Sequence, residues 1–464
     1  MVRGYAGSGT KPKKRVTAAL PFRRIRSLRT GQPDGFATIC LTKFWERVAY
    51  YGLQAILILY LTEYLLVTRA ADEIWLVASI STLFEVKGQA LASSITGGFL
   101  TLISIIPIVG GVITDRVLGP ARAILVGGSI MALGHLAMAY EPALILALTC
   151  IALGIGLFRG AIASQLGSLY DTDSRRVEGF QLYFLAVNLA GLAGPFVVGT
   201  IGEEAGWHWG FATSAFAMLV ALSIYAFGHF DPAKARKVEV PAYAPSSTLL
   251  SARKWPSNIL LIAGVGLLAI PNFQLFNAYL LCVKKDFALM LFGQPIPVSW
   301  LVGMDAALSL CVLVASVPAW RALERHIGPV SSLTRASFGA LFVCAGTCML
   351  LAAALMGGGG KLTLLWCVAF QFLNAAGLAQ ILPAALAELG SKDNVKGSAT
   401  SISGYFLGLF FAGLLSTVLA ARFEALPITT FWSLHLGCAV AGAAMLLLAK
   451  KAADHFVRAQ GQMG

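Results

Sequence analysis

Charged residues are scarce in this chain. Only 12% of its 464 residues are Asp, Glu, Lys or Arg, whereas 57% are hydrophobic. Soluble domains carry about 25% charged residues, so the composition excludes a water-soluble globular protein. It predicts an all-α polytopic membrane protein, because a long apolar run spans a bilayer as a helix.

Motifs of enzymes and metal sites are also missing. The eight cysteines fall almost all within apolar segments and show no ligand or disulfide spacing. The sequence has no nucleophile elbow, Walker loop, His-Glu-x-x-His motif or cysteine–histidine cluster. We therefore expect no enzyme activity, no metal and no cofactor, and we interpret the cysteines as small packing residues.

Apolar segments long enough to span a bilayer occur twelve times. They lie at residues 36–67, 94–114, 121–140, 142–164, 180–202, 208–228, 257–281, 298–320, 332–356, 361–388, 394–421 and 427–449. The predicted domains are a basic tail (1–35), a six-helix half (36–228), a polar linker (229–256), a second six-helix half (257–449) and a tail (450–464). Between the first two segments, residues 70–89 contain an apolar pattern too short to span, which predicts an amphipathic surface helix.

Positive charge is distributed unevenly along these segments. With both termini cytoplasmic, 26 of the 35 Lys and Arg fall in inner tails and loops and only six in outer loops. The positive-inside rule therefore predicts cytoplasmic termini, and we expect a bacterial inner (plasma) membrane. The basic N-terminal tail has no secretory-signal core. It could bind nucleic acid, but we favour a solvated tail that sets topology and touches anionic lipid.

The first segment contains three ionisable side chains within an otherwise apolar run. Steps of three and four place the following residues on one helical face: Lys43, Arg47, Tyr50 and Gln54. Glu46 lies four residues before Tyr50. A charge near the middle of a membrane helix costs about 2.5 to 3.5 kcal/mol, so this face should look into a polar interior. Alternatively, the helix could shift outward and leave its two cations as headgroup anchors.

One loop pattern occurs in both halves at a constant offset of 209 residues. Residues 115–120 read Asp-Arg-Val-Leu-Gly-Pro, and residues 324–329 read Glu-Arg-His-Ile-Gly-Pro. Matching loops at matching positions indicate an internal repeat, and hence two pseudo-symmetric halves. The residues that we assign to an inner gate are Asp115, Arg116, Glu324 and Arg325.

These motifs resemble the proton-dependent oligopeptide transporter family, a branch of the major facilitator superfamily. Its first helix carries Glu-x-x-Glu-Arg-Phe-x-Tyr-Tyr-Gly, matched here at Glu46, Arg47, Tyr50, Tyr51 and Gly52, with Lys43 for the first Glu. Residues 154–161 resemble the family's Gly-x-Gly-x-Phe-Lys-Pro-Asn, with Arg159 for the lysine. Residues 183–191 resemble its second signature, Phe-Tyr-x-x-Ile-Asn-x-Gly, which includes Asn188.

The resemblance implies the major facilitator fold and proton-coupled uptake of di- and tripeptides by alternating access. It implies that Glu46 pairs with Arg159 between the first and fourth helices. The residues that we expect to bind substrate are Arg47, Tyr50, Tyr51, Gln54, Asn188 and Asp305, and those for coupling are Lys43, Glu46 and Arg159. Purely structural roles stay open for three of these residues: Arg159 could anchor the end of its helix, Asn188 could bridge helices, and Asp305 could reach water.

Departures from the family leave other functions open. The glutamates usual on helices 7 and 10 are missing, and an Arg at position 159 cannot release a proton as a Lys can. One alternative is an organic-anion uniporter or exchanger without proton coupling, and another is a membrane sensor that does not transport. The expected partners are a small solute, a short peptide or organic anion, with protons and the lipid bilayer, and we expect a monomer.

Overall fold

The computed structural model describes residues 32–170, 173–228, 255–357, 360–389 and 398–461. Within these residues, twelve helices are long and apolar enough to cross a membrane. The spans are Phe36–Thr68, Gly88–Leu118, Pro120–Ala137, Glu141–Gly167, Gly179–Ala205, Trp207–Phe227, Pro256–Phe276, Trp300–Ile327, Ser332–Met356, Leu365–Leu389, Gly404–Ala421 and Ile428–His455. The predicted all-α polytopic fold is therefore confirmed.

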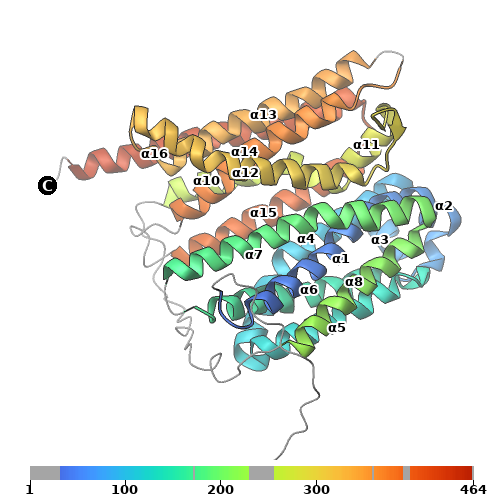
Figure 1. Ribbon diagram of the computed structural model, residues 1–464. Helices are drawn as coiled ribbons and strands as arrows, with labels where there is room; N and C mark the ends of the chain where they lie inside the picture. Colours follow the sequence, from blue (N-terminus) through green and yellow to red (C-terminus); the bar gives the residue numbers. More distant parts are fainter. Residues whose placement is uncertain (1–31, 171–172, 229–254, 358–359, 390–397, 462–464) are drawn as a thin grey trace, which may run out of the picture.

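The N-terminal half and the C-terminal half form two helical bundles, blue to green and yellow to red in Figure 1. The N-terminal half contains α1 (Phe36–Tyr60), α2 (Leu66–Thr68), α3 (Val77–Phe84), α4 (Gly88–Ile113), α5 (Pro120–Ala137), α6 (Leu144–Gly167), α7 (Asp173–Gly194) and α8 (Trp207–Phe227). Its π-helical turns are Leu61–Leu65, Thr114–Leu118, Pro195–Gly199 and Ile201–Ala205, and its 3-10 turns are Ala71–Glu73 and Glu141–Ala143.

The C-terminal half repeats this plan with one small hairpin added. It contains α10 (Trp255–Phe273), a 3-10 turn (Gln274–Phe276), α11 (Ala278–Asp286), β1 (Met290–Leu291), β2 (Gln294–Pro295), α12 (Trp300–Ile327), α13 (Ser332–Met356), α14 (Leu365–Leu389), α15 (Ser398–Ala421) and α16 (Ile428–Gly461). The strands pair antiparallel. Most of the predicted tail at 1–35 and linker at 229–256 lie outside the described residues.

Two sequence expectations differ from the observed helices. The seventh segment is not continuous, because Pro271 removes a backbone donor near the end of α10 and the chain passes through Gln274–Phe276 before α11 begins. The last helix does not end near Ala449 but continues to Gly461. The short helix expected within 70–89 is α3, whose Leu83 and Phe84 are exposed.

The repeated Gly-Pro loops adopt nearly the same backbone conformation. Gly119 has φ 72° and ψ 159°, and Gly328 has φ 84° and ψ 178°. A positive φ with an extended ψ is a region that side chains other than glycine rarely enter. The loop repeat read from the sequence is therefore a structural repeat as well.

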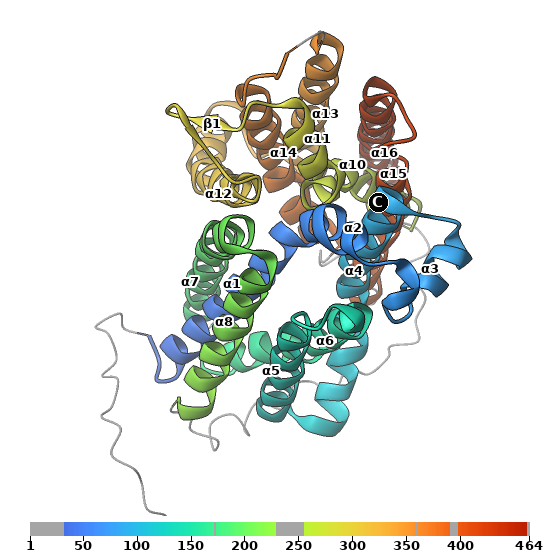
Figure 2. The ribbon, with the colours of Figure 1, turned by 90° about the vertical axis from the view of Figure 1, so that its right-hand side faces the viewer.

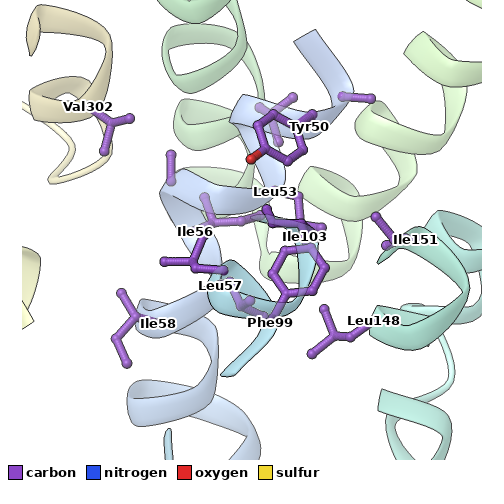
Figure 3. Close-up of a cluster of buried hydrophobic side chains, with 14 of the residues drawn as sticks. Tyr50, Leu53, Ile56, Leu57, Ile58, Phe99, Ile103, Leu148, Ile151 and Val302 are labelled. Atoms are coloured by element: carbon purple, nitrogen blue, oxygen red, sulfur yellow. The ribbon is translucent and has the colours of Figure 1, made fainter. Parts of the chain in front are cut away.

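Apolar packing holds α1 at the centre of its half. Figure 3 shows Leu53 and Leu57 of α1 packed near Phe99 of α4 and Leu148 and Ile151 of α6, and all of these side chains are buried. The close approach of α4 to α6 depends on small residues, since a Cβ on Gly110 would lie 2.2 Å from the carbonyl oxygen of Gly156. This core fixes the face of α1 that carries the ionisable residues.

The two halves are joined at one end of the bundle. We name the distal end as the one that carries the connections 69–87, 287–299 and 422–427; Figure 2 is a view from that end. In this view α7 lies next to α12 and α4 lies next to α15. A Cβ on Gly97 of α4 would lie 2.2 Å from the hydroxyl oxygen of Thr417 on α15. The helices of the two halves thus meet with very little space between them here.

Polar contacts reinforce this distal junction. The carboxylate of Glu203 accepts hydrogen bonds from the backbone N–H groups of Val298, at 2.9 Å, and Ser299, at 2.8 Å. These groups lie at the start of α12, where helix N–H groups lack intrahelical partners. The indole of Trp300 donates to the hydroxyl of Thr200 at 2.7 Å. We name the Glu203, Val298 and Ser299 contact the distal latch.

Candidate functional site

A cavity of about 320 Å³ lies between the two halves. Its lining residues from the N-terminal half are Arg47, Tyr50, Tyr51, Gln54, Leu100, Ile103, Ser104, Arg159, Val187, Asn188 and Gly191. Those from the C-terminal half are Asn272, Phe273, Phe276, Val302, Asp305, Ala306 and Ser309. All six residues predicted to bind substrate therefore line one cavity. A second cavity, of about 390 Å³, lies in the C-terminal half and contains none of them.

The ionisable face of α1 is buried. Lys43 is 3% exposed, Glu46 0% and Arg47 4%. The Lys43 ammonium lies 3.0 Å from the Glu46 carboxylate, and Arg47 donates to both oxygens of that carboxylate at 2.9 and 3.1 Å. One carboxylate thus serves two cations of its own helix. The alternative in which Lys43 and Arg47 reach headgroups is wrong, because these side chains lie inside the bundle.

The expected ion pair between Glu46 and Arg159 is not formed in the structure. Among the ion pairs of the described residues, Glu46 is paired with Lys43 and Arg47 and not with Arg159. The physical reason is the lysine at position 43, which supplies a cation one turn from Glu46 where the family has an acid. Helix α6 meets this cluster through Phe158 instead, whose ring centroid lies 5.5 Å from the Lys43 ammonium.

Tyr50 lies between the two guanidinium groups of the cavity. Its ring centroid is 4.4 Å from the Arg47 guanidinium carbon and 5.9 Å from that of Arg159. Its hydroxyl accepts a hydrogen bond from the Gln54 amide at 2.8 Å. Arg47 also lies 5.8 Å from the ring of Tyr51. Cation–π contacts of this kind stabilise buried guanidinium groups without neutralising them.

The predicted residues outside α1 occupy the facing walls. Asn188 of α7 donates to the carbonyl of Phe184 on its own helix at 2.8 Å, so this amide hydrogen bond does not bridge two helices. On α12, one carboxylate oxygen of Asp305 is buried and has no hydrogen-bond partner in the described part of the chain. Lys43 does not line the cavity; it lies behind Arg47, toward α6.

Amides of the seventh membrane segment, α10 to α11, and of the tenth, α14, mostly join helices together. Asn374 of α14 donates to the side-chain oxygen of Asn272 at 2.9 Å, and Gln371 of α14 donates to the Leu301 carbonyl at 3.0 Å. Asn277 donates to the Ser93 carbonyl, across the two halves, at 3.0 Å. Of these residues only Asn272 lines the cavity. These two segments therefore carry hydrogen-bonded amides and lack the glutamates that are usual in the family.

The four residues assigned to a gate do not act as one group in this structure. Glu324 pairs with Arg335 of α13, not with Arg325, and accepts the backbone N–H of Val330 at 3.1 Å. Asp115 and Arg116 are exposed, and no ion pair of theirs occurs within the described ranges. The role of all four residues in a gate stays a prediction.

Sequence reasoning missed the distal latch and the apolar part of the cavity wall. Phe273 and Phe276 follow the break at Pro271, and that proline was the available signal for a broken helix at the cavity. Glu203 ends an apolar segment next to a second glutamate, and nothing in this pattern indicates that its partner is the start of α12.

Twelve membrane helices in two six-helix halves with a cavity between them are the architecture of the major facilitator fold. A family model described as PTR2, POT family, matches residues 121–242. The di-/tripeptide transporter of Lactococcus lactis is 40% identical over 202 residues, which cover 43% of this chain but only 38% of that relative. Peptide transporter YePEPT of Yersinia enterocolitica is 26% identical over 500 residues, covering 90% of this chain and 94% of the relative.

The fold agrees over nearly the whole chain. A crystal structure of a peptide transporter POT in complex with sulfate superposes with a TM-score of 0.75 at 22% identity, covering 91% of this chain and 96% of that one. The chain is therefore similar to the POT family in sequence at residues 121–242 and similar to a POT transporter in fold over nearly its whole length.

Proposed function

We propose that this protein is a secondary transporter of short peptides. The observation that carries the proposal is the cavity with guanidinium groups on one wall, Arg47 and Arg159, and the Asp305 carboxylate on the other. A zwitterionic peptide has the complementary pattern, since its carboxylate fits a guanidinium and its ammonium fits a carboxylate. A volume of about 320 Å³ is in the range of small-molecule sites.

The proposed mechanism is alternating access between the halves at 36–228 and 257–449. The distal junction is closed in this structure, so opening that end requires the distal latch to break. With both termini cytoplasmic, as the positive-inside rule favours, the distal end is the outer gate of an inner-membrane protein. A peptide that contacts Arg47 on one half and Asp305 on the other links the two halves while access alternates.

Proton coupling is the finer part of the proposal. The carboxyl groups available inside the bundle near the cavity are Glu46 and Asp305. Glu46 already has two cations beside it, whereas Asp305 has a buried oxygen without a hydrogen-bond partner in the described residues. The free oxygen of Asp305 is available to the peptide ammonium, so we infer that Glu46, the other carboxyl group, takes up the transported proton.

The test is uptake of labelled dialanine into proteoliposomes that contain the purified chain, with an inward proton gradient and without one. Accumulation above equilibrium that collapses with the gradient supports proton-coupled transport. Uptake that only equilibrates supports the peptide substrate and removes the coupling. Absence of uptake contradicts peptide transport and leaves the sensor or the anion carrier.

An organic-anion carrier is the second candidate, and the surplus of buried cations favours it. Lys43, Arg47 and Arg159 outnumber Glu46 on the N-terminal wall and directly behind it. One structural neighbour was itself solved with sulfate. Inhibition of dialanine uptake by sulfate or succinate, followed by direct uptake of the labelled anion, distinguishes this candidate from a peptide carrier.

A further inference from the structure

The charges around the cavity do not balance for a peptide with one carboxylate. With all groups ionised, Lys43, Arg47 and Arg159 against Glu46 leave two positive charges on the N-terminal wall and directly behind it. Asp305 supplies one negative charge on the facing wall. A zwitterionic peptide adds no net charge, so one positive charge remains without compensation in a buried site, which is costly.

The surplus charge is located at Arg159. Arg47 already shares Glu46 with Lys43. Arg159 lines the cavity, and the described part of the chain contains no carboxylate within ion-pair distance of it. Its aromatic neighbour Tyr50 attracts the cation through its ring face but carries no opposite charge. A guanidinium presents a fixed fork of donors that suits a carboxylate.

The two guanidinium groups also share one neighbour, because both lie near the ring of Tyr50, at 4.4 and 5.9 Å from its centroid. Two carboxylates that are held a few bonds apart on one residue could therefore occupy the two guanidinium groups together. A C-terminal aspartate or glutamate carries such a pair, the α-carboxylate and the side-chain carboxylate.

We infer that the cavity prefers peptides of net charge −1 that end in an acidic residue, with the second carboxylate bound by Arg159. This inference rests on the proposed function and names its preferred substrates. Such a peptide makes the loaded cavity neutral, with the N-terminal ammonium at Asp305 and the two carboxylates at Arg47 and Arg159.

The experiment measures inhibition of labelled dialanine uptake in proteoliposomes by Ala-Glu, by its uncharged isostere Ala-Gln and by Glu-Ala. We expect Ala-Glu to inhibit at a concentration about tenfold lower than Ala-Gln, the effect of one added charge-assisted contact. We expect Glu-Ala, which has the same net charge, to fall closer to Ala-Gln. In Arg159→Gln the ratio between Ala-Glu and Ala-Gln should fall to about one, and in Arg159→Lys, which keeps the charge, it should stay above one.

The same peptides can be compared without a transport measurement. Ala-Glu should raise the melting temperature of the detergent-purified chain more than Ala-Gln does at equal concentration, since ligands that bind the folded state stabilise it. Equal effects of Ala-Glu and Ala-Gln in the wild type overturn the inference, and they are expected if Lys43 is neutral in the empty cavity. Equal effects of Ala-Glu and Glu-Ala overturn the C-terminal assignment. Dialanine uptake distinguishes these two outcomes from failure of the proposed function. Uptake persists in both outcomes, whereas it is absent if the protein does not transport peptides.

Discussion

The two walls of the cavity are built from different chemistry. The N-terminal wall carries two guanidinium groups, of which Arg47 is paired with Glu46 of its own helix and Arg159 lies over the ring of Tyr50. The C-terminal wall carries one amide, Asn272, which accepts a hydrogen bond from Asn374 of a neighbouring helix, and a single acid, Asp305. The difference teaches that two repeated halves can keep the same arrangement of helices while the side chains that face the cavity diverge. Charged side chains at the cavity are concentrated on the N-terminal half, while the C-terminal half contributes one carboxylate.

Replacing Glu46 should have the largest effect on the N-terminal side of the cavity. Glu46→Gln leaves the Lys43 and Arg47 cations without a carboxylate, and breaking a buried ion pair from one side costs about 3–5 kcal/mol. We expect loss of uptake and a clear fall of the melting temperature in detergent. The control is Glu73→Gln, which removes an exposed partner of Arg69 and should change neither quantity. An unchanged melting temperature in Glu46→Gln would show that the cluster contributes little to stability.

The opposite wall should respond in binding and not in stability. Asp305→Asn removes the carboxylate proposed for the peptide ammonium, a charge-assisted contact worth about 10- to 100-fold in affinity. The melting temperature without ligand should stay level or rise, because the wild-type carboxylate has an oxygen without a hydrogen bond in the described residues. Ser309→Ala, at another position of this wall, is the matched control. Unchanged dialanine affinity in Asp305→Asn would remove this residue from the site.

The repeated loops offer a test of equivalence between the halves. Gly119→Ala and Gly328→Ala place a Cβ at a positive φ, at a cost of about 1–2 kcal/mol each, and neither Cβ meets a neighbour within 4 Å. We expect similar losses of thermal stability in both variants. Gly111→Ala is the control, because this helical position is also open and an alanine there favours the helix. A loss confined to one loop would show that the two halves differ in stability at this point.

The smallest expected effect is at the distal latch. Glu203→Gln keeps one acceptor oxygen but loses the charge that faces the Val298 and Ser299 N–H groups, a change of about 1 kcal/mol. We expect a larger share of molecules with an open distal end. Spin labels at Val67 and Phe292, in a background without the eight native cysteines, measure this as a longer distance population. Glu204→Gln is the control, and equal distances in both variants would contradict a latch.

Sequence alone could predict most of the fold because the bilayer leaves few choices. Each span must be a long apolar helix, and the twelve predicted segments match the twelve observed spans closely. The face of α1 could also be predicted, since steps of three and four fix which side chains share a side. Arg47, Tyr50 and Gln54 therefore line the cavity as expected.

The partners of the charged residues could not be predicted in the same way. Three cations lie near Glu46, and the choice among them depends on side-chain conformation and on a chain-specific lysine, not on helical periodicity. The contact of Glu203 with the start of α12 joins segments about 95 residues apart through backbone N–H groups, which every residue except proline carries. Such a contact leaves no mark in the residue pattern.

The pairing within α1 has a consequence for how the protein is made. Lys43, Glu46 and Arg47 lie within about one turn of one helix, so this helix brings a neutralising partner with it as it leaves the ribosome. The insertion machinery then meets a segment with one net charge, where three separate charges would cost about 2.5 to 3.5 kcal/mol each at the centre of a helix. The first span can therefore enter the bilayer before α6 and Arg159 have been synthesised.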